Sequence, residues 1–312
     1  MPEPEGAAAA LRAQADPASG SREWEIDAGE PPIADAAAAA DGAGDAADRV
    51  VADDQLADML REGDLAVTGR LTDASNVSLV GTVTRDGASV ECVYKPVRGE
   101  RPLWDFPDGT LAGREVASYL IGQAAGWRCV PVTVLRDGPF GPGMVQQWIG
   151  DADSDLTVDL LPADEVPAGW LPVLAAEDGD GNPVVVAHAD DPALAVLAGF
   201  DLVVNNADRK ASHILPTADG RVRGVDHGVS LHREPKLRTV LWGWAGQPLT
   251  GAVTAGLDRL ADALTAGLAD ELAELISEPE VLALAERIAA LRADPRFPAP
   301  PRNRTPIPWP PL

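Results

Sequence analysis

The pattern of apolar and polar positions divides the chain near residue 50. Residues 1–48 are rich in Ala, Asp, Glu, Gly and Pro and have few branched or aromatic apolar side chains. Such a segment cannot bury enough surface to offset the entropy of ordering, so we expect a disordered acidic tail. From residue 50 onward, apolar residues recur at helical or alternating spacing, which predicts a folded domain.

The first part of the folded region predicts a small sheet with helices. A helical pattern covers 50–62, and a longer helix is expected from Leu111 to Ala125, with Thr110 as its N-cap and Gly126 after its end. Apolar segments of strand length lie at 65–72, 77–84, 89–95, 130–135 and 144–149. Short hairpin turns between several of them favour antiparallel pairing.

The second part predicts mainly helices. Their patterns cover 192–204, 248–276 and 279–291. Two short strands, 213–215 and 223–225, flank a turn. An acidic, Gly- and Pro-punctuated stretch precedes them, with one hairpin expected near Gly179 and with His188 expected at the surface. The Pro-rich tail, 295–312, should be extended, either as a ligand for a partner or lying back across the domain.

Composition narrows the possible partners and compartment. A formal net charge of -24 makes nucleic acid an improbable partner and opposes binding to an anionic membrane. No apolar run has the length of a membrane span, and the acidic N-terminus does not resemble a secretory signal. Cys92 and Cys129 lie far apart in apolar surroundings, which predicts reduced core thiols in a cytoplasmic protein.

The residues with the clearest chemical potential lie in two segments, 205–215 and 225–228. The first contains Asp208 and, five positions later, His213; the second, on the next strand, contains Asp226 before a Gly. An Asp that handles an acceptor hydroxyl, followed by side chains that hold a metal against ATP, is the arrangement that phosphoryl transfer requires.

Two charged residues further upstream fit the same chemistry. Lys95 ends an apolar strand, where an ammonium group can reach nucleotide phosphates. Glu115 is the sole carboxylate of the helix predicted over 111–125. Without the two downstream loops, Lys95 would be interpreted as an ordinary lysine at a strand end, and Glu115 as a favourable charge near a helix start.

These loops resemble the catalytic and metal-binding loops of the protein-kinase-like superfamily. They are most similar to the phosphatidylinositol 3-/4-kinase-like branch and to an actinobacterial family related to it, over roughly residues 65–248. The resemblance implies an α+β two-lobed fold. An antiparallel N-lobe sheet with one helix would span residues 49–150, and a mainly helical C-lobe would span 151–294, with ATP and Mg²⁺ or Mn²⁺ between them.

The resemblance also implies roles for individual residues. Asp208 would act on the acceptor hydroxyl, Lys210 would neutralise charge on the transferring phosphoryl group, and Arg209 would brace the loop. Lys95 would bind the α- and β-phosphates and would be positioned by Glu115. The lysine at 210 is typical of serine/threonine kinases, whereas the lipid-kinase branch usually has a His there.

Further residues would contact the nucleotide. By resemblance, the turn that contains Ser75 and Asn76 covers the phosphates, although it lacks the glycines of protein kinases. The segment Gln147, Trp148 and Ile149 lies where the lobes would join, so its backbone would bind the adenine edge. Trp148 or Ile149 would then pack against the face of the base.

The metal ligands depart from the family pattern. Asp226 is the expected direct ligand, but His213 stands where kinases carry an Asn. Magnesium binds imidazole poorly. His213 would therefore act through water or on a phosphate, or a single metal would be used, or the cation would be manganese. Asn205 and Asn206 could offer carboxamide oxygens instead.

The sequence thus predicts an ATP-dependent phosphotransferase whose acceptor is a hydroxyl of a protein or small molecule, in preference to an inositol lipid. The residue at 213 also motivates an alternative, a nucleotide-binding pseudokinase that works as a scaffold. A third hypothesis is that the same fold transfers AMP instead of phosphate. The segment that follows the second loop contains two basic and two aromatic residues, which would either form an acceptor site or serve as packing anchors. They are Lys236, Arg238, Trp242 and Trp244.

Overall fold

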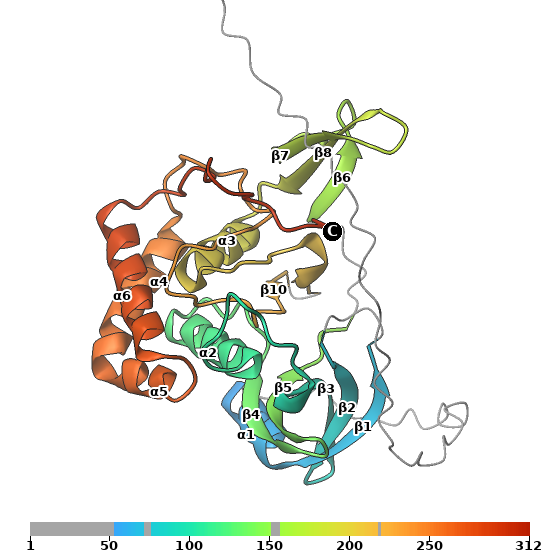
Figure 1. Ribbon diagram of the computed structural model, residues 1–312, viewed down its shortest axis with the longest axis vertical. Helices are drawn as coiled ribbons and strands as arrows, with labels where there is room; N and C mark the ends of the chain where they lie inside the picture. The colour runs from blue at the N-terminus through green and yellow to red at the C-terminus, as the bar shows by residue number, and fades with distance from the viewer. Residues whose placement is uncertain (1–52, 72–75, 151–156, 218–219) are drawn as a thin grey trace, which may run out of the picture. The chain divides into compact units, whose positions relative to one another are not determined.

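An antiparallel five-stranded sheet forms the first part of the folded region (Figure 1). The computed structural model describes residues 53–71, 76–150, 157–217 and 220–312, so the tail expected at 1–48 lies outside the described residues. The strand order is β1-β2-β3-β5-β4. The strands are β1 (Asp64–Arg70), β2 (Leu79–Arg85), β3 (Ala88–Pro96), β4 (Thr133–Gly138) and β5 (Gly141–Gln147).

Two helices pack on this sheet, α1 (Asp53–Glu62) against β4, β2 and β5 and α2 (Leu111–Ala124) against β4 and β5. The Thr110 hydroxyl accepts a hydrogen bond from Gly113 N at 2.9 Å, which satisfies one free amide of the first turn of α2. Gly126, just after the helix, has a positive φ of 69°, a conformation that favours glycine. The N-cap and the stop expected from the sequence are therefore confirmed.

A second, three-stranded sheet follows in the order β6-β8-β7, with β6 (Val158–Pro162), β7 (Trp170–Glu177) and β8 (Pro183–Ala189). The expected hairpin near Gly179 is confirmed, since it joins β7 to β8. His188 corrects the expectation of a surface residue: its side chain is buried, its ring lies 4.3 Å from that of Trp244, and its Nε2 accepts from Gly243 N at 3.0 Å.

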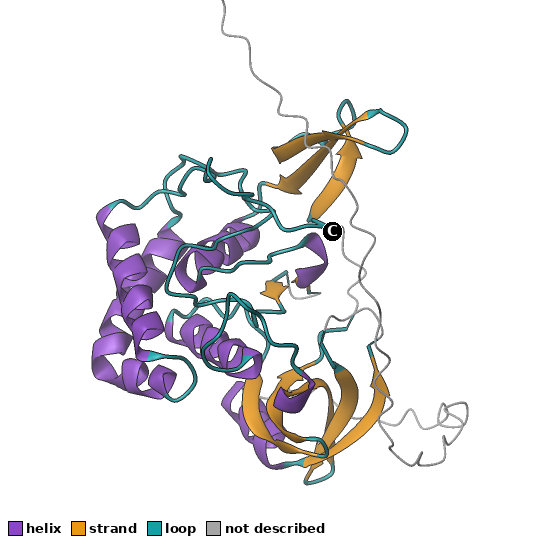
Figure 2. Ribbon diagram, in the orientation of Figure 1, coloured by secondary structure: helices purple, strands orange, loops and turns teal. Residues whose placement is uncertain are grey.

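The remaining part is mainly helical, as Figure 2 shows in purple. The elements are α3 (Pro192–Val204), the 3₁₀ turn η2 (Ala211–His213), β9 (Ile214–Pro216), β10 (Val222–Gly224), α4 (Gly251–Ala263), the π-helical turn η3 (Leu264–Leu268), α5 (Ala269–Ala273) and α6 (Glu278–Ala293). The prediction of one helix over 248–276 was wrong, because Gly267 adopts a φ of 123° and interrupts it. An antiparallel pairing joins β9 to β10.

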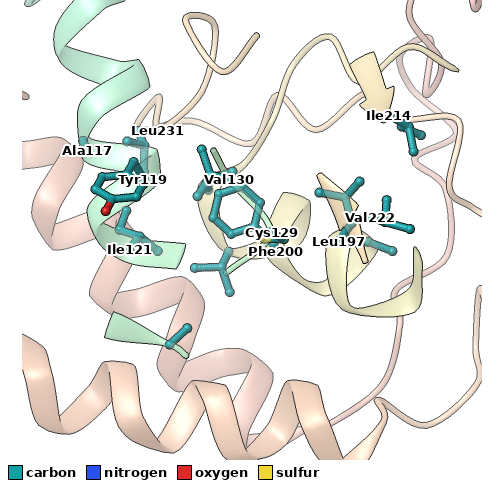
Figure 3. Close-up of a cluster of buried hydrophobic side chains, with 14 of the residues drawn as sticks. Ala117, Tyr119, Ile121, Cys129, Val130, Leu197, Phe200, Ile214, Val222 and Leu231 are labelled. Carbon is teal, nitrogen blue, oxygen red and sulfur yellow. The ribbon is translucent and has the colours of Figure 1, made fainter. Parts of the chain in front are cut away.

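A shared hydrophobic core supports the loops that follow α3 and β10. Figure 3 shows Ile121 of α2, Leu197 and Phe200 of α3, and Ile214 and Val222 of the β9–β10 hairpin in one buried cluster. Each large apolar side chain contributes roughly 1.5–3 kcal/mol when fully buried. The hairpin therefore rests on α3, which fixes the two loops relative to each other.

The Pro-rich tail lies back along the domain. Leu249 N donates to Pro295 O at 2.8 Å, and Thr239 N donates to Pro306 O at 3.1 Å. Further along, Ala211 N donates to Pro311 O at 2.9 Å. These bonds tie the tail to the segment after β10 and to the loop after α3. Within the described ranges, no helix combines the length and the hydrophobicity needed to cross a membrane.

Candidate active site

The loop after α3 begins at a residue that ends the helix. Asn205 adopts a left-handed conformation with φ of 53°, which Asn tolerates better than most residues. Its carboxamide donates to the carbonyls of His232 and Glu234. The Asn206 side chain accepts from Asp208 N at 2.9 Å. Both Asn side chains are buried in structural bonds, which does not fit the suggestion that they provide metal ligands.

Lys95 of β3 joins the sheet to the second loop. Its Nζ lies 2.8 Å from Glu115 Oε1 of α2 and 3.0 Å from Asp226 Oδ1, which follows β10. Burial by itself would lower the pKa of Lys95, but the two carboxylates outweigh it and raise that pKa above its usual value. The ammonium is therefore charged at neutral pH and available to an anionic ligand.

The backbone of Asp226 is held on both sides by buried charged groups. Asp226 has a φ of 59°, which costs a non-glycine residue on the order of 1 kcal/mol. The carbonyl before it, that of Val225, accepts from Arg209 Nη1 at 2.8 Å, and the amide after it, that of His227, donates to Glu115 Oε2 at 2.9 Å. These two bonds keep the carboxylate directed at Lys95.

Arg209 is the centre of a fully buried polar network. Its Nε and Nη2 donate to both oxygens of Asp201 of α3, at 3.0 to 3.2 Å, and Asp201 also accepts from Asn206 Nδ2 at 3.0 Å. Arg209 Nη2 lies 2.6 Å from His227 Nε2. Arginine can only donate, so His227 accepts as a neutral ring. Burial, with Arg209 adding to it, holds the pKa of His227 well below its usual value.

Arg209 therefore braces the two loops from beneath. Its side chain is fully buried. Its partner Asp201, which was not among the predicted site residues, stands seven residues before Asp208 in an otherwise apolar helical run. A carboxylate in such a run is itself a signal, since an acidic residue is rarely buried unless it is paired.

Asp208 and Lys210 are both half-buried in the first loop. Lys210 Nζ is 3.5 Å from Asp208 Oδ2. Burial raises the pKa of Asp208, and the Lys210 ammonium opposes that effect. A carboxylate with a raised pKa and a neighbouring ammonium is suited to accept a proton from a hydroxyl.

His213 lies between the two acidic residues. Its Nδ1 is 3.0 Å from the carbonyl oxygen of Asp208, so Nδ1 carries the proton and Nε2 carries the lone pair. Nε2 lies 3.5 Å from Asp226 Oδ2. Burial lowers the pKa of His213 to about 4. At neutral pH the ring is therefore uncharged and presents a lone pair next to a carboxylate.

A cavity of about 560 Å³ brings the predicted residues together. Those that line it are Asn76, Lys95, Gln147, Trp148, Ile149, Asp208, Lys210, His213 and Asp226. Glu115 and Arg209 support the cavity from behind through the bonds described above. Ser75 lies outside the described residues. The volume falls within the range of small-ligand sites.

The segment after β5 differs in detail from the expected adenine site. The amide of Gln147 donates to Val132 O at 2.9 Å, and that of Trp148 donates to Glu91 O at 2.9 Å. Because the sheet engages both amides, a base edge would have to use other backbone groups, such as those of Ile149. Asn76 is fixed as well, since its Oδ1 accepts from Arg101 N at 2.8 Å.

The four residues considered as an acceptor site lie in different environments. Trp242 and Trp244 are buried, which favours packing. Lys236 Nζ lies 3.2 Å from Asp105 Oδ2. Arg238, in contrast, is half-buried beside the first loop, where its Nε donates to Ala207 O at 2.7 Å.

The donor set is suitable for a divalent cation bound together with a nucleotide. Asp226 offers a carboxylate and His213 an imidazole nitrogen on the same side of the cavity. Within the described ranges no three His, Cys, Asp or Glu side chains converge on a point. A cation here would therefore complete its coordination with phosphate oxygens and water, as Mg²⁺ does in kinase sites.

Comparison with solved structures identifies the fold. The Golgi casein kinase with Mn/ADP bound matches 77% of this chain and 74% of its own, with a TM-score of 0.50 and 14% identity. A second structure of the Golgi casein kinase gives a TM-score of 0.48, also at 14% identity, over 77% of this chain and 73% of that one. The first match confirms the expected protein-kinase-like fold, but it does not single out the phosphatidylinositol 3-/4-kinase-like branch.

Comparison of sequences identifies the family. No family model matches the chain. Protein Rv2133c of Mycobacterium tuberculosis (strain ATCC 25618 / H37Rv), however, is 52% identical over 267 residues, which cover 83% of this chain and 95% of that protein. At this identity and coverage, the chain belongs to the same family as Protein Rv2133c.

Proposed function

We propose that this chain is an ATP-dependent phosphotransferase that acts on a hydroxyl acceptor. The observation that carries the proposal is the contact of Lys95 Nζ with both Glu115 and Asp226, at 2.8 and 3.0 Å, at a cavity that Asp208 also lines. Residues 49–150 would form the N-lobe and 151–294 the C-lobe. This arrangement supports a kinase mechanism, in which positioning and charge stabilisation provide most of the catalysis.

In this proposal the nucleotide lies across the cavity. The Lys95 ammonium binds phosphate oxygens, and Glu115 keeps it in place from its buried position in α2. Asn76, which lines the cavity, lies over the phosphates. The base lies against Trp148 and Ile149, with its polar edge towards the backbone of Ile149, because the sheet already engages the amides of Gln147 and Trp148.

Asp226 and His213 would hold the divalent cation. A bound Mg²⁺ or Mn²⁺ would neutralise charge on the phosphates. The lone pair on His213 Nε2 favours Mn²⁺, since imidazole suits borderline transition metals better than it suits Mg²⁺. The hydrogen bonds from Arg209 to Val225 O and from His227 N to Glu115 hold the backbone on both sides of Asp226, which keeps its carboxylate in position for this role.

Asp208 and Lys210 would act on the acceptor. Asp208 orients the hydroxyl and removes its proton, while Lys210 faces the transferring group and offsets its negative charge. The acceptor is a protein or small-molecule hydroxyl. The lysine at 210 supports that choice over an inositol lipid, and so it weighs against a phosphatidylinositol 3-/4-kinase-like acceptor.

The experiment is incubation of the purified chain with ATP labelled at the γ-phosphate, Mn²⁺ or Mg²⁺, and a cell lysate. Transfer of label should be lost in Asp208→Ala and Asp226→Ala, strongly reduced in Lys95→Met, and unchanged in Asp258→Asn, which alters an exposed ion pair with Arg292. Unchanged transfer in any of the first three variants would refute the proposal.

Two other functions stay under test, a pseudokinase, which the position of His213 beside Asp226 motivates, and transfer of AMP by the same fold. A shift in melting temperature with ADP and Mn²⁺, but no transfer with either metal, would indicate a nucleotide-binding pseudokinase. A product whose mass increases by an AMP group instead of a phosphate would indicate an AMP transferase. Intact-mass spectrometry of all products, with and without label, separates these outcomes, because transfer of AMP releases the labelled γ-phosphate in pyrophosphate.

A further inference from the structure

Gln146 of β5 is a buried polar residue on the cavity face of the sheet, with only 4% of its surface exposed. Gln146 pairs with Val93 of β3, and Met144 of the same strand pairs with Lys95. Directly paired residues of an antiparallel sheet direct their side chains to one face, and alternate residues along a strand share that face. Val93, Lys95 and Gln146 therefore lie on one face, and all three line the cavity.

Thr133 of β4 fixes the orientation of the Gln146 carboxamide. The Thr133 hydroxyl donates its single proton to Pro131 O at 2.8 Å, so towards Gln146 its oxygen can only accept. Gln146 Nε2 accordingly donates to Thr133 Oγ1 at 2.8 Å. A carboxamide turned by 180° would place two acceptors against each other. The carboxamide oxygen, Oε1, is therefore the end that faces away from Thr133.

This carboxamide oxygen is an acceptor that the protein does not satisfy. Among the residues that the structure describes, no N–H or O–H group donates to Gln146 Oε1. The atom is still accessible, and because Gln146 lines the cavity, that access is from the cavity. A buried acceptor without a donor is costly. The arrangement therefore favours a ligand that brings a donor to this point.

The wall around Gln146 suits a flat ring. The proposed function places the base beside Trp148 and Ile149, two and three residues further along the same segment. Apolar side chains from the sheet and from the β9–β10 hairpin also line the cavity: Leu71, Val93, Leu215 and Val225. An apolar wall with one fixed polar group is typical of a site that orients a planar ligand.

We infer that Gln146 Oε1 accepts a hydrogen bond from the 6-amino group of adenine and thereby selects ATP over GTP. Adenine has an amino donor at this position, whereas guanine has an oxygen acceptor. Guanine would bring an acceptor to an acceptor that Thr133 prevents from turning, so neither would gain a partner. This inference rests on the proposed function, which places a nucleotide in the cavity, and it adds a side chain that reads the base. Thr133 is then a positioning residue.

The test is calorimetric titration of ADP, GDP and inosine diphosphate, each with Mn²⁺, into the full chain. Inosine has the 6-oxygen of guanine but not its 2-amino group, so inosine diphosphate tests the 6-position alone. ADP should bind at least about tenfold more tightly than either of the other two, because only adenine satisfies the buried oxygen.

Two variants test the roles of the individual residues. Gln146→Met removes the acceptor at similar length, so ADP should bind about tenfold more weakly and the preference for ADP should disappear. Thr133→Val frees the carboxamide to turn its nitrogen towards a 6-oxygen, so inosine diphosphate and GDP should gain relative to ADP. A purely structural role of Thr133 would lower stability without changing this ratio. Gln123→Met is the matched control, since Gln123 in α2 donates to Asp53 and does not line the cavity.

Equal affinity of the unaltered chain for ADP and inosine diphosphate would overturn the inference and needs no variant. An undiminished preference for ADP in Gln146→Met would overturn it as well. In both cases nucleotide binding itself would stand. If none of the three diphosphates bound, the proposed function would be refuted together with the selection by Gln146. Failure of base selection and failure of nucleotide binding are therefore distinguishable.

Discussion

Replacement of Asp201 by Asn tests how the two loops are held together. Asp201 and Arg209 are both fully buried, and three hydrogen bonds at 3.0 to 3.2 Å join them. The Asp201→Asn variant keeps the shape but leaves the Arg209 guanidinium without its counter-charge. Removal of one partner from a buried ion pair typically costs about 3–5 kcal/mol, because the other charge stays buried.

That cost is large compared with the stability of a typical domain, which is about 5–15 kcal/mol. For a chain of this size it corresponds to a fall in melting temperature on the order of 10 °C. Urea unfolding followed by circular dichroism would measure the loss in free energy of unfolding. Asp258→Asn is the matched control, since its ion pair with Arg292 is exposed and such pairs contribute about 0–1 kcal/mol.

The double variant Asp201→Leu with Arg209→Met separates stability from function. It removes both charges, so it should be less destabilised than Asp201→Asn. It also removes the bond from Arg209 to Val225 O, so the shift in melting temperature caused by ADP and Mn²⁺ should shrink. A loss in Asp201→Asn no greater than that in Asp258→Asn would refute the bracing role of the network.

Three further predictions concern the cavity. Glu115→Gln should raise the KM for ATP in steady-state assays, because Lys95 then keeps only one carboxylate partner; an unchanged KM would contradict this. His213→Asn should move the metal preference from Mn²⁺ towards Mg²⁺, measured as the ratio of rates with the two ions, and an unchanged ratio would count against His213 as a ligand. The transfer rate should fall as pH drops through the pKa of Asp208, because the protonated carboxyl cannot accept a proton. Burial raises this pKa and Lys210 lowers it, so Lys210→Met should move the acidic limb of the pH–rate profile to higher pH. An acidic limb that stays in place would contradict the assignment.

Local patterns were sufficient to predict most elements of the fold. The helix after Thr110 and the strand before Lys95 depend on capping and apolar spacing, which neighbouring residues determine. The loops with Asp208 and Asp226 were found by spacing and resemblance. The structure brings both residues to one cavity with Lys95, although their catalytic roles stay predictions.

Long-range contacts were beyond local patterns. The burial of His188 depends on Trp244 and Gly243, more than fifty residues away. Asp201 could be interpreted only once Arg209 was placed beneath the loops. The break at Gly267 was missed because its flanking residues are good helix formers, and glycine tolerates the positive φ found there.

In the proposed function, Lys95, Asp208 and Asp226 act on one nucleotide. The most direct measurement is a crystal structure of the full chain with a non-hydrolysable ATP analogue and Mn²⁺. Phosphate oxygens should lie within hydrogen-bond distance of Lys95 Nζ, and Mn²⁺ should bind to Asp226 with the γ-phosphate facing Asp208. A nucleotide bound elsewhere, or with its phosphates directed away from Asp208 and Asp226, would contradict it.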